Sequence, residues 1–319
     1  MGLIMGQNMP RSWVLWGCGA LALLGMGSCN ASSLAPVAAP IRPAPQNQPT
    51  NQPNPQPIPQ PAGQPLGEIS ITGEFTQGGW ATGRAPAGTQ ALALDAIPVR
   101  LAADGQFIIA FDRDAGSAAR LVAQLADGRS VARALVISPR AWQIERIPLG
   151  PRPGTPPNQA FLTRRAGELA QINAARALNT GAEGWRQRFV WPVTGRISGR
   201  FGSQRIYPAG PAAYHSGIDI ATGTSGTPFV APADGVVILA AQSSFSLEGR
   251  LLMIDHGMGL NSAFLHCSGL DVKVGDIVRQ GQVIGRIGAT GRATGPHLHW
   301  SMKWGRTKLD PLLFAGPML

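Results

Sequence analysis

The stretch Gly-Pro-His-Leu-His-Trp-Ser-Met-Lys-Trp at residues 295–304 constrains the fold of this chain more than any other. After the Gly-Pro turn, polar and apolar side chains alternate, which is typical of a β-strand with two unlike faces. His297 and His299 share the polar face. Two imidazoles about 7 Å apart on one strand face can serve a single metal site, one as a ligand and the other as its polar neighbour. The pattern predicts a strand that packs through one face and performs chemistry through the other.

Three further histidines, His215, His256 and His266, lie upstream in similarly glycine-bounded contexts and complete the five in the chain. His215 precedes Asp219 by four residues, a spacing that places both side chains on one face of a strand or of a helix. The glycine and the alternating apolar residues around Asp219 favour a strand or a loop. His256 ends a predicted strand before a Gly-rich turn, and we interpret it as structural.

Composition favours a β-rich chain with more than one domain. The 319 residues exceed one ordinary domain, only 14% are charged, and 41 glycines and 28 prolines indicate many turns. The net charge of +10 comes almost wholly from arginine, but no basic run or nucleic-acid motif accompanies it, so we expect no nucleic-acid partner. A cationic surface suits an anionic envelope polymer, and an arginine-rich genome composition explains the charge equally well.

Residues 1–29 are predicted to be an export signal, which we exclude from the fold. Its apolar run, residues 13–24, is too short to span a bilayer comfortably, and small residues precede Cys29. This ending resembles a bacterial lipobox, in which Cys29 is the lipidated residue and Met26 replaces the usual leucine. The alternative is ordinary signal cleavage after Ala31 or shortly beyond it. Both predict a protein of the periplasm and cell envelope, and lipidation adds an anchor in the outer or inner membrane.

Cysteine usage agrees with export without disulfides. Cys18 would leave with the signal and Cys29 would be acylated, so only Cys267 would remain. A lone thiol cannot form an internal bridge.

Four further segments follow the signal. Residues 30–66 are rich in Pro, Gln and Asn and nearly free of charge, so we expect a disordered tether. Residues 67–149 contain about seven short strand signals with Asp-Gly turns, which predict a β-sandwich-like accessory domain. Residues 150–184 are predicted to be a linker and a short helix, and residues 185–319 to be a Gly-rich antiparallel β-domain.

The predicted helix begins after Asn158, whose side chain can cap it, and ends near residues 179–181. Its apolar residues Phe161, Leu162, Leu169 and Ile172 fall roughly on one stripe. We therefore expect this helix to pack between the two β-rich domains.

Three motifs, His215-x-x-x-Asp219, Phe264-x-His266 and the run at residues 290–300, together resemble the lysostaphin and LytM-type zinc metallopeptidases, which cleave peptide bonds in bacterial peptidoglycan. The resemblance covers residues 191–313. It implies a β-rich metallopeptidase domain that binds one zinc ion. It also implies that His215, Asp219 and His299 ligate the zinc, and that His266 and His297 are the catalytic histidines beside it.

The chemistry of these residue types agrees with the resemblance. Two histidines and a carboxylate form a hydrolytic zinc set that leaves one position for water, whose pKa falls towards about 7. The chain has no His-Glu-x-x-His motif, so no glutamate base is indicated. The resemblance implies instead that His266 and His297 activate the water and stabilise the oxyanion, with the division between them left open.

Neighbouring residues are interpreted more simply. Cys267 replaces the leucine usual in the family and would face away from His266, as a small apolar substitute. Tyr207 and Tyr214 do not align with the tyrosine that some family members use, so we assign them no role. We expect residues 203–214 and 242–250 to form the walls of a substrate groove.

Three functions fit the sequence. The first is an active endopeptidase that cuts peptidoglycan cross-links. The second is a non-enzymatic activator of a cell-wall amidase, with an amidase or a division protein as partner, and the third is a peptidoglycan-binding lipoprotein in which zinc only holds the fold. The intact set of histidines and aspartate favours the first. The accessory domain could in addition occlude the groove.

Overall fold

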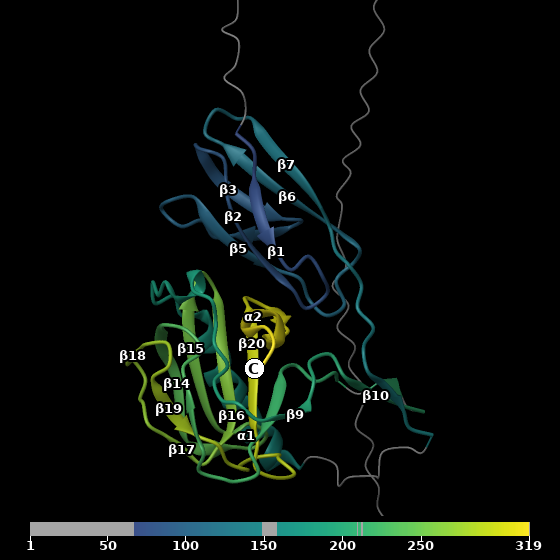
Figure 1. Cartoon of the computed structure of the whole chain (residues 1–319), viewed down its shortest axis with the longest axis vertical. Helices are drawn as coiled ribbons and strands as arrows, with labels where there is room; N and C mark the ends of the chain where they lie inside the picture. Colours follow the sequence, from purple (N-terminus) through teal and green to yellow (C-terminus); the bar gives the residue numbers. More distant parts are fainter. Residues whose placement is uncertain (1–66, 149–157, 209, 212, 319) are drawn as a thin grey trace, which may run out of the picture. The chain divides into compact units, whose positions relative to one another are not determined.

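The computed structural model describes residues 67–148, 158–208, 210–211 and 213–318 (Figure 1). The predicted signal, Cys29, the tether and most of the linker lie outside the described residues. The described chain is mostly antiparallel β-sheet with two α-helices, so the expected mainly β fold class is confirmed. Among the described residues, no helix has both the length and the apolar character needed to cross a membrane.

Residues 70–136 form two antiparallel sheets. One sheet has the order β1-β2-β5 and comprises β1 (Ser70–Gly73), β2 (Trp80–Arg84) and β5 (Gln106–Ala110). The other has the order β4-β3-β6-β7 and comprises β3 (Thr89–Leu94), β4 (Ile97–Val99), β6 (Ala118–Leu125) and β7 (Ser130–Val136). Buried side chains from both, such as Phe107 and Leu121, belong to one hydrophobic cluster. The short, Gly-containing strand β2 gave no clear signal in the sequence.

The main C-terminal sheet holds the predicted histidine strand near its centre. Its order is β18-β14-β15-β16-β20-β12-β9, and β21 also pairs with β20. These strands are β9 (Arg196–Gly199), β12 (Ile218–Ala221), β14 (Gly235–Phe245), β15 (Gly249–Gly257), β16 (Leu260–Cys267), β18 (Ile277–Val278), β20 (Leu298–Trp304) and β21 (Thr307–Leu309).

Strand β20 has the two unlike faces that its sequence predicts. Leu298, Trp300 and Met302 are fully buried in the hydrophobic core. His299 points to the opposite face, and His297 lies just before the strand, in an isolated antiparallel bridge with Gly288. Because a slip of one residue would exchange the two faces, the buried face fixes the position of the histidines.

Two smaller sheets, a 3-10 turn and a short helix also belong to the described elements. One sheet consists of β13 (Pro228–Val230), β19 (Val283–Arg286) and β17 (Gly269–Leu270), and the other of β11 (Gly210–Pro211), β10 (Gln204–Tyr207) and β8 (Ile144–Arg146). A 3-10 turn, η1 (Gly184–Arg186), and the helix α2 (Pro311–Ala315) lie elsewhere in the C-terminal part. Strand β8 runs parallel to β10, so a segment that precedes the linker contributes to the C-terminal half.

Helix α1 (Gln159–Ala177) begins after Asn158, whose Oδ1 accepts a hydrogen bond from the Phe161 amide at 2.8 Å, as predicted. The expected apolar stripe is only partly correct, because Leu162 and Leu169 are 48% and 42% exposed. The buried side chains are instead those of Glu168, Ile172 and Ala175. Ile172 and Ala175 pack on apolar side chains of β14, β15 and β16. The helix therefore covers one face of the C-terminal sheet and does not lie between the two β-rich regions as expected.

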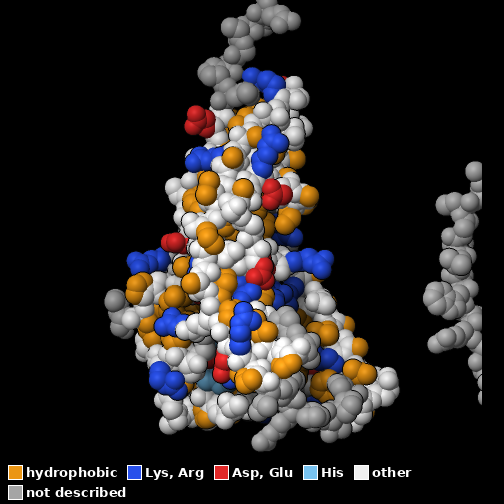
Figure 2. Space-filling view, turned by 90° about the vertical axis from the view of Figure 1, so that its right-hand side faces the viewer, with side chains coloured by type: hydrophobic (Ala, Val, Ile, Leu, Met, Phe, Trp, Pro, Cys, Tyr) orange, Lys and Arg blue, Asp and Glu red, His pale blue; other side chains and the backbone are white. Residues whose placement is uncertain are grey.

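Basic side chains are scattered over the molecular face shown in Figure 2, between apolar and acidic ones. Several of the arginines form ion pairs, including Arg205 with Glu145 at 2.8 Å and Arg279 with Asp234 at 2.8 Å. The basic side chains on this face are therefore interspersed with others and do not gather into one patch.

Candidate active site

The three predicted metal ligands come together through strand register. Asp219 of β12 lies directly opposite His299 of β20 in the antiparallel ladder. His215 belongs to the segment that leads into β12, and Gly217 lets this segment pass close to β20. A Cβ atom at Gly217 would lie 2.7 Å from His299 Nε2 and 2.5 Å from the Trp300 carbonyl oxygen. Glycine at this position is therefore required for the close approach.

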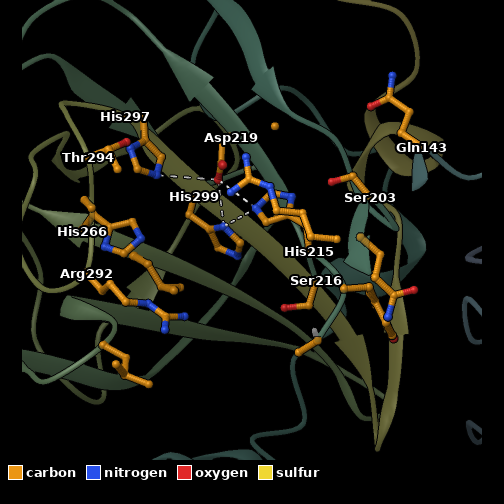
Figure 3. A pocket seen from close by; sticks show the side chains of 18 of the residues that line it. Gln143, Ser203, His215, Ser216, Asp219, His266, Arg292, Thr294, His297 and His299 are labelled. Atoms are coloured by element: carbon orange, nitrogen blue, oxygen red, sulfur yellow. Dashed lines mark hydrogen bonds and ion pairs between the residues drawn. The ribbon is translucent and has the colours of Figure 1, made fainter. Parts of the chain in front are cut away.

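The ligand atoms form a compact triangle (Figure 3). His215 Nε2 lies 3.1 Å from Asp219 Oδ1 and 3.1 Å from His299 Nδ1, and His299 Nδ1 lies 2.8 Å from Asp219 Oδ1. A tetrahedral cation with bonds of about 2.0–2.2 Å holds its ligand atoms roughly 3.3 Å apart. The three separations are thus within about half an ångström of that spacing, and the group can hold a metal ion.

Polar contacts prepare these groups for a metal. Burial raises the pKa of Asp219, but hydrogen bonds from His215 and His299 outweigh it and hold the pKa of that carboxyl well below its usual range. Burial lowers the pKa of His215, but its contacts with Asp219 and the Arg200 carbonyl raise that pKa above its usual value. His215 Nδ1 donates to the Arg200 carbonyl at 3.0 Å. This bond orients the ring so that Nε2 faces the other ligands.

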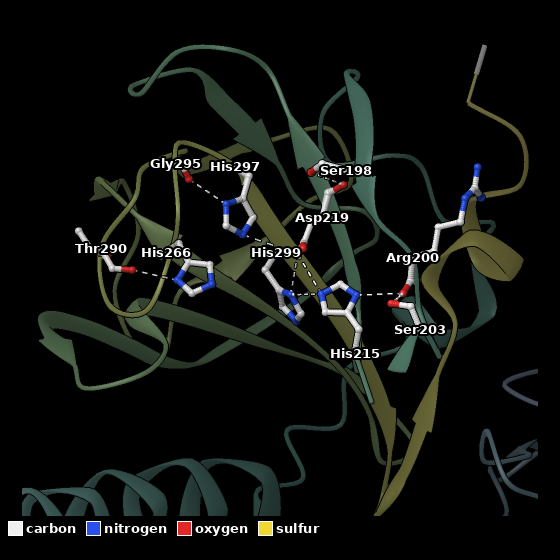
Figure 4. A network of polar contacts seen from close by, with 10 residues as sticks. All are labelled: Ser198, Arg200, Ser203, His215, Asp219, His266, Thr290, Gly295, His297 and His299. Atoms are coloured by element: carbon white, nitrogen blue, oxygen red, sulfur yellow. Dashed lines mark hydrogen bonds and ion pairs between the residues drawn. The ribbon is translucent and has the colours of Figure 1, made fainter. Parts of the chain in front are cut away.

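His266 and His297 lie beside the ligand triangle, and a backbone carbonyl contacts Nδ1 of each ring (Figure 4). His266 Nδ1 donates to the Thr290 carbonyl at 2.9 Å, and His297 Nδ1 donates to the Gly295 carbonyl at 2.9 Å. With Nδ1 engaged in this way, Nε2 is the ring nitrogen left for a further contact in each residue. The two ring centroids are 4.9 Å apart, and His297 Nε2 lies 3.7 Å from Asp219 Oδ1.

His266 is held in an unusual state. Burial lowers the pKa of its imidazole to about 4, so the ring is neutral at pH 7 and can accept a proton. Its backbone φ is +66°, a left-handed conformation that costs a residue with a side chain about 1–2 kcal/mol. Such strain persists only where the surroundings over-determine the conformation, and it concentrates at functional sites.

The five residues open into one groove with a volume of about 1070 Å³. Both segments expected from the sequence to line it contribute, the first through Ser203 to Arg205 and Tyr214 and the second through Leu247 and Glu248. No signal in the sequence indicated that residues 143–145 line the groove. Two basic residues that the sequence did not single out also line it, Lys308 and Arg292, and Arg292 lies beside His266 in Figure 3.

The acidic side chains that line the groove have polar partners, whereas two of its basic side chains form no ion pair among the described contacts. Its carboxylates are engaged, because Glu145 pairs with Arg205 at 2.8 Å and Glu248 pairs with Arg165 at 2.6 Å, while Asp219 contacts the histidines. Among the described contacts, Arg292 and Lys308 form no ion pair. The Lys308 ammonium lies 4.3 Å from the centre of the Tyr214 ring, and the Tyr214 hydroxyl donates to Asp112 Oδ1 at 3.1 Å.

Two residues singled out in the sequence lie outside this group. His256 is completely buried, with Nδ1 2.8 Å from the Asp234 carbonyl and Nε2 2.9 Å from the Ser262 hydroxyl. The side chain of Cys267 is buried in the hydrophobic core, and burial raises the pKa of its thiol to about 12. Both residues have the structural environments that the sequence analysis expected.

Comparison with known proteins identifies this region. The model of peptidase family M23 matches residues 213–311. The peptidoglycan DD-endopeptidase ShyA of Vibrio cholerae is 38% identical over 117 residues, which are 36% of this chain and 26% of ShyA. The DD-carboxypeptidase/endopeptidase Mpg of Neisseria gonorrhoeae is 38% identical over 123 residues, which are 38% of this chain and 27% of Mpg. The match spans only about a quarter of the length of these relatives.

A solved peptidase M23 structure from Pseudomonas aeruginosa extends the likeness beyond the matched region. It superposes with a TM-score of 0.59 at 28% identity and covers 76% of this chain and 96% of its own. The superposition therefore takes in more than residues 213–311. The part of the chain that contains the ligand triangle and the two neighbouring histidines is a peptidase family M23 domain.

Proposed function

We propose that this protein is a zinc-dependent endopeptidase that hydrolyses peptide cross-links of bacterial peptidoglycan in the cell envelope. The observation that carries the proposal is the meeting of His215, Asp219 and His299 at metal-ligand spacing beside His266 and His297, at the floor of one groove. The name of ShyA supports the choice of peptidoglycan as substrate, and the name of Mpg supports endopeptidase activity.

The donor set suits zinc, which favours histidine nitrogen and carboxylate oxygen in a tetrahedral site. When bound, zinc would lower the pKa of a water molecule and polarise the scissile carbonyl. The neutral His266 ring would accept a proton at Nε2 from the attacking water. His297 lies beside His266, with ring centroids 4.9 Å apart, and would stabilise the oxygen that becomes negatively charged.

The groove also supports a substrate with negative charge. Arg292 and Lys308 present cationic groups without ion-pair partners among the described contacts, and carboxylates of a peptide stem would match them. Export, lipidation of Cys29 and association with an amidase or a division protein stay predictions. The complete set of site residues favours the enzyme over a non-enzymatic activator.

The test is digestion of purified peptidoglycan by the full-length chain and by His266→Ala, with mass spectrometry of the products and zinc analysis of both proteins. We expect cleaved peptide bonds with the wild type only, and one zinc ion in each protein. His256→Gln is the matched control, because it alters a histidine outside the groove and should lower stability without removing cleavage by the folded protein. Zinc binding by both proteins with cleavage by neither would refute the proposal.

A further inference from the structure

Helix α1 makes polar contacts with the groove wall that its role as a linker does not require. The side chain of Glu168 is only 5% exposed. Its Oε1 accepts hydrogen bonds from the Ser246 amide at 2.6 Å and from the Ser246 hydroxyl at 2.8 Å. Arg164 Nε donates to the same oxygen at 3.0 Å, and Arg165 donates to Oε2 at 3.1 Å. Every oxygen of this buried carboxylate is therefore engaged.

A second connection joins the same helix to the same turn. Arg165 donates to both carboxylate oxygens of Glu248, at 2.6 and 2.7 Å. The two side chains are each 16% exposed, so solvent screens the pair less than it screens a surface ion pair. Bidentate arginine–carboxylate pairs fix geometry as well as adding energy. Helix α1 thus holds residues 246–248, the turn between β14 and β15, at both ends.

Residues 246–248 also make backbone contacts with His266 and with the segment beside it. The His266 amide donates to the Glu248 carbonyl at 2.8 Å, and the Arg292 amide donates to the Leu247 carbonyl at 3.0 Å. Gly249 packs so closely on Thr290 that a Cβ atom there would lie 2.3 Å from the Thr290 hydroxyl. Thr290 is the residue whose carbonyl orients the His266 ring. The turn is therefore part of what maintains the left-handed backbone of His266.

We propose that Glu168 and Arg165 are positioning residues for the hydrolytic site, which act on His266 through residues 246–248. Neither residue touches the ligand triangle in the described contacts, and both lie outside the span that the family model matches. The functional unit accordingly begins at or before Asn158. A fragment that starts at residue 185, the predicted start of the C-terminal β-domain, would lack the contacts of Glu168 and Arg165 with residues 246–248.

The test compares the full-length wild type with Glu168→Gln, which keeps the size of the side chain and removes its charge. Glu183→Gln is the matched control, because Glu183 is 62% exposed and pairs with Arg186. Three measurements are made: steady-state kinetics (kcat and KM) on peptidoglycan peptides, zinc bound per chain, and hydrogen exchange of the His266 amide. The expected change in kcat rests on the proposed function. Hydrogen exchange does not require an active enzyme, so it tests the positioning role separately.

For Glu168→Gln we expect kcat to fall about 10- to 100-fold, as a small misplacement of a catalytic group does. We also expect faster exchange at His266 and unchanged zinc binding. Glu183→Gln should match the wild type in all three. Wild-type kcat and exchange in Glu168→Gln would overturn the inference, as would loss of zinc together with activity, which would assign Glu168 to the fold as a whole. If the wild type cleaves nothing, the proposed function fails and exchange at His266 alone decides.

Discussion

Substitution of Gly217 by alanine should damage the metal centre with little effect on the rest of the domain. A Cβ atom there would lie 2.5 Å from the Trp300 carbonyl oxygen and 2.7 Å from His299 Nε2, whereas ordinary contact begins at 3.4 Å. The carbonyl belongs to the central strand β20, which cannot move easily. The segment bearing His215 must therefore retreat by the difference between 3.4 and 2.5 Å, or 0.9 Å. Metal sites tolerate deviations of only about 0.2 Å.

A retreat of this size should weaken metal binding about 10- to 100-fold, the range seen when the support of a ligand is lost. Competition with a chromophoric chelator would measure the zinc dissociation constant of Gly217→Ala and of the wild type. Gly269→Ala is the control, because a Cβ atom at Gly269 would meet nothing within 4 Å. If Gly217→Ala binds zinc as tightly as the wild type, the backbone around β12 and β20 can accommodate the methyl group without displacing His215, and the reasoning is refuted.

Three further predictions concern protons, substrate charge and packing. Because the pKa of His215 is raised above its ordinary 6.5, protons should displace the metal as the pH falls through that raised value, and unchanged zinc occupancy in acid would contradict this. Arg292→Gln and Lys308→Gln should each raise KM about 5-fold for peptides with free carboxylates. Neither substitution should alter KM for amidated peptides, and an equal effect on both classes would exclude recognition of the carboxylate. Trp300→Ala should lower the free energy of unfolding by about 3–5 kcal/mol, measured by denaturant titration, since Trp300 is fully buried. A loss below about 1 kcal/mol would mean that the core refills the space.

The features predicted from the sequence are those encoded by local periodicity. Alternation at residues 298–304 gives strand β20 and its two faces, and the side chain of Asn158 gives the start of α1. The four-residue spacing places His215 just before the strand that contains Asp219. Once that strand, β12, pairs with β20, both side chains lie near His299. Each of these signals is complete within about ten residues, so no distant partner has to be known.

The features that the sequence did not reveal depend on distant partners. Periodicity placed Leu169 on the buried side of α1, but Glu168 is buried instead because Ser246, 78 residues away, supplies its hydrogen bonds. Burial of a carboxylate is favourable only where such partners exist, and no local pattern announces them. The pairing of β8 with β10, which brings residues 143–145 to the groove, is non-local in the same way.

The two halves of the site are held by different means, and this difference has functional consequences. Asp219 and His299 sit on paired strands whose register is fixed by a buried face, so these two side chains are held as firmly as the core. His266 is the last residue but one of β16 and depends on the 246–248 turn, on Thr290 and, through them, on α1. Mutations around the turn should therefore alter kcat while zinc stays bound, whereas mutations between β12 and β20 should release zinc first. A single rigid site would lose both properties together, so measuring zinc content and kcat in parallel across the two sets of variants tests whether the metal centre and the base are supported independently.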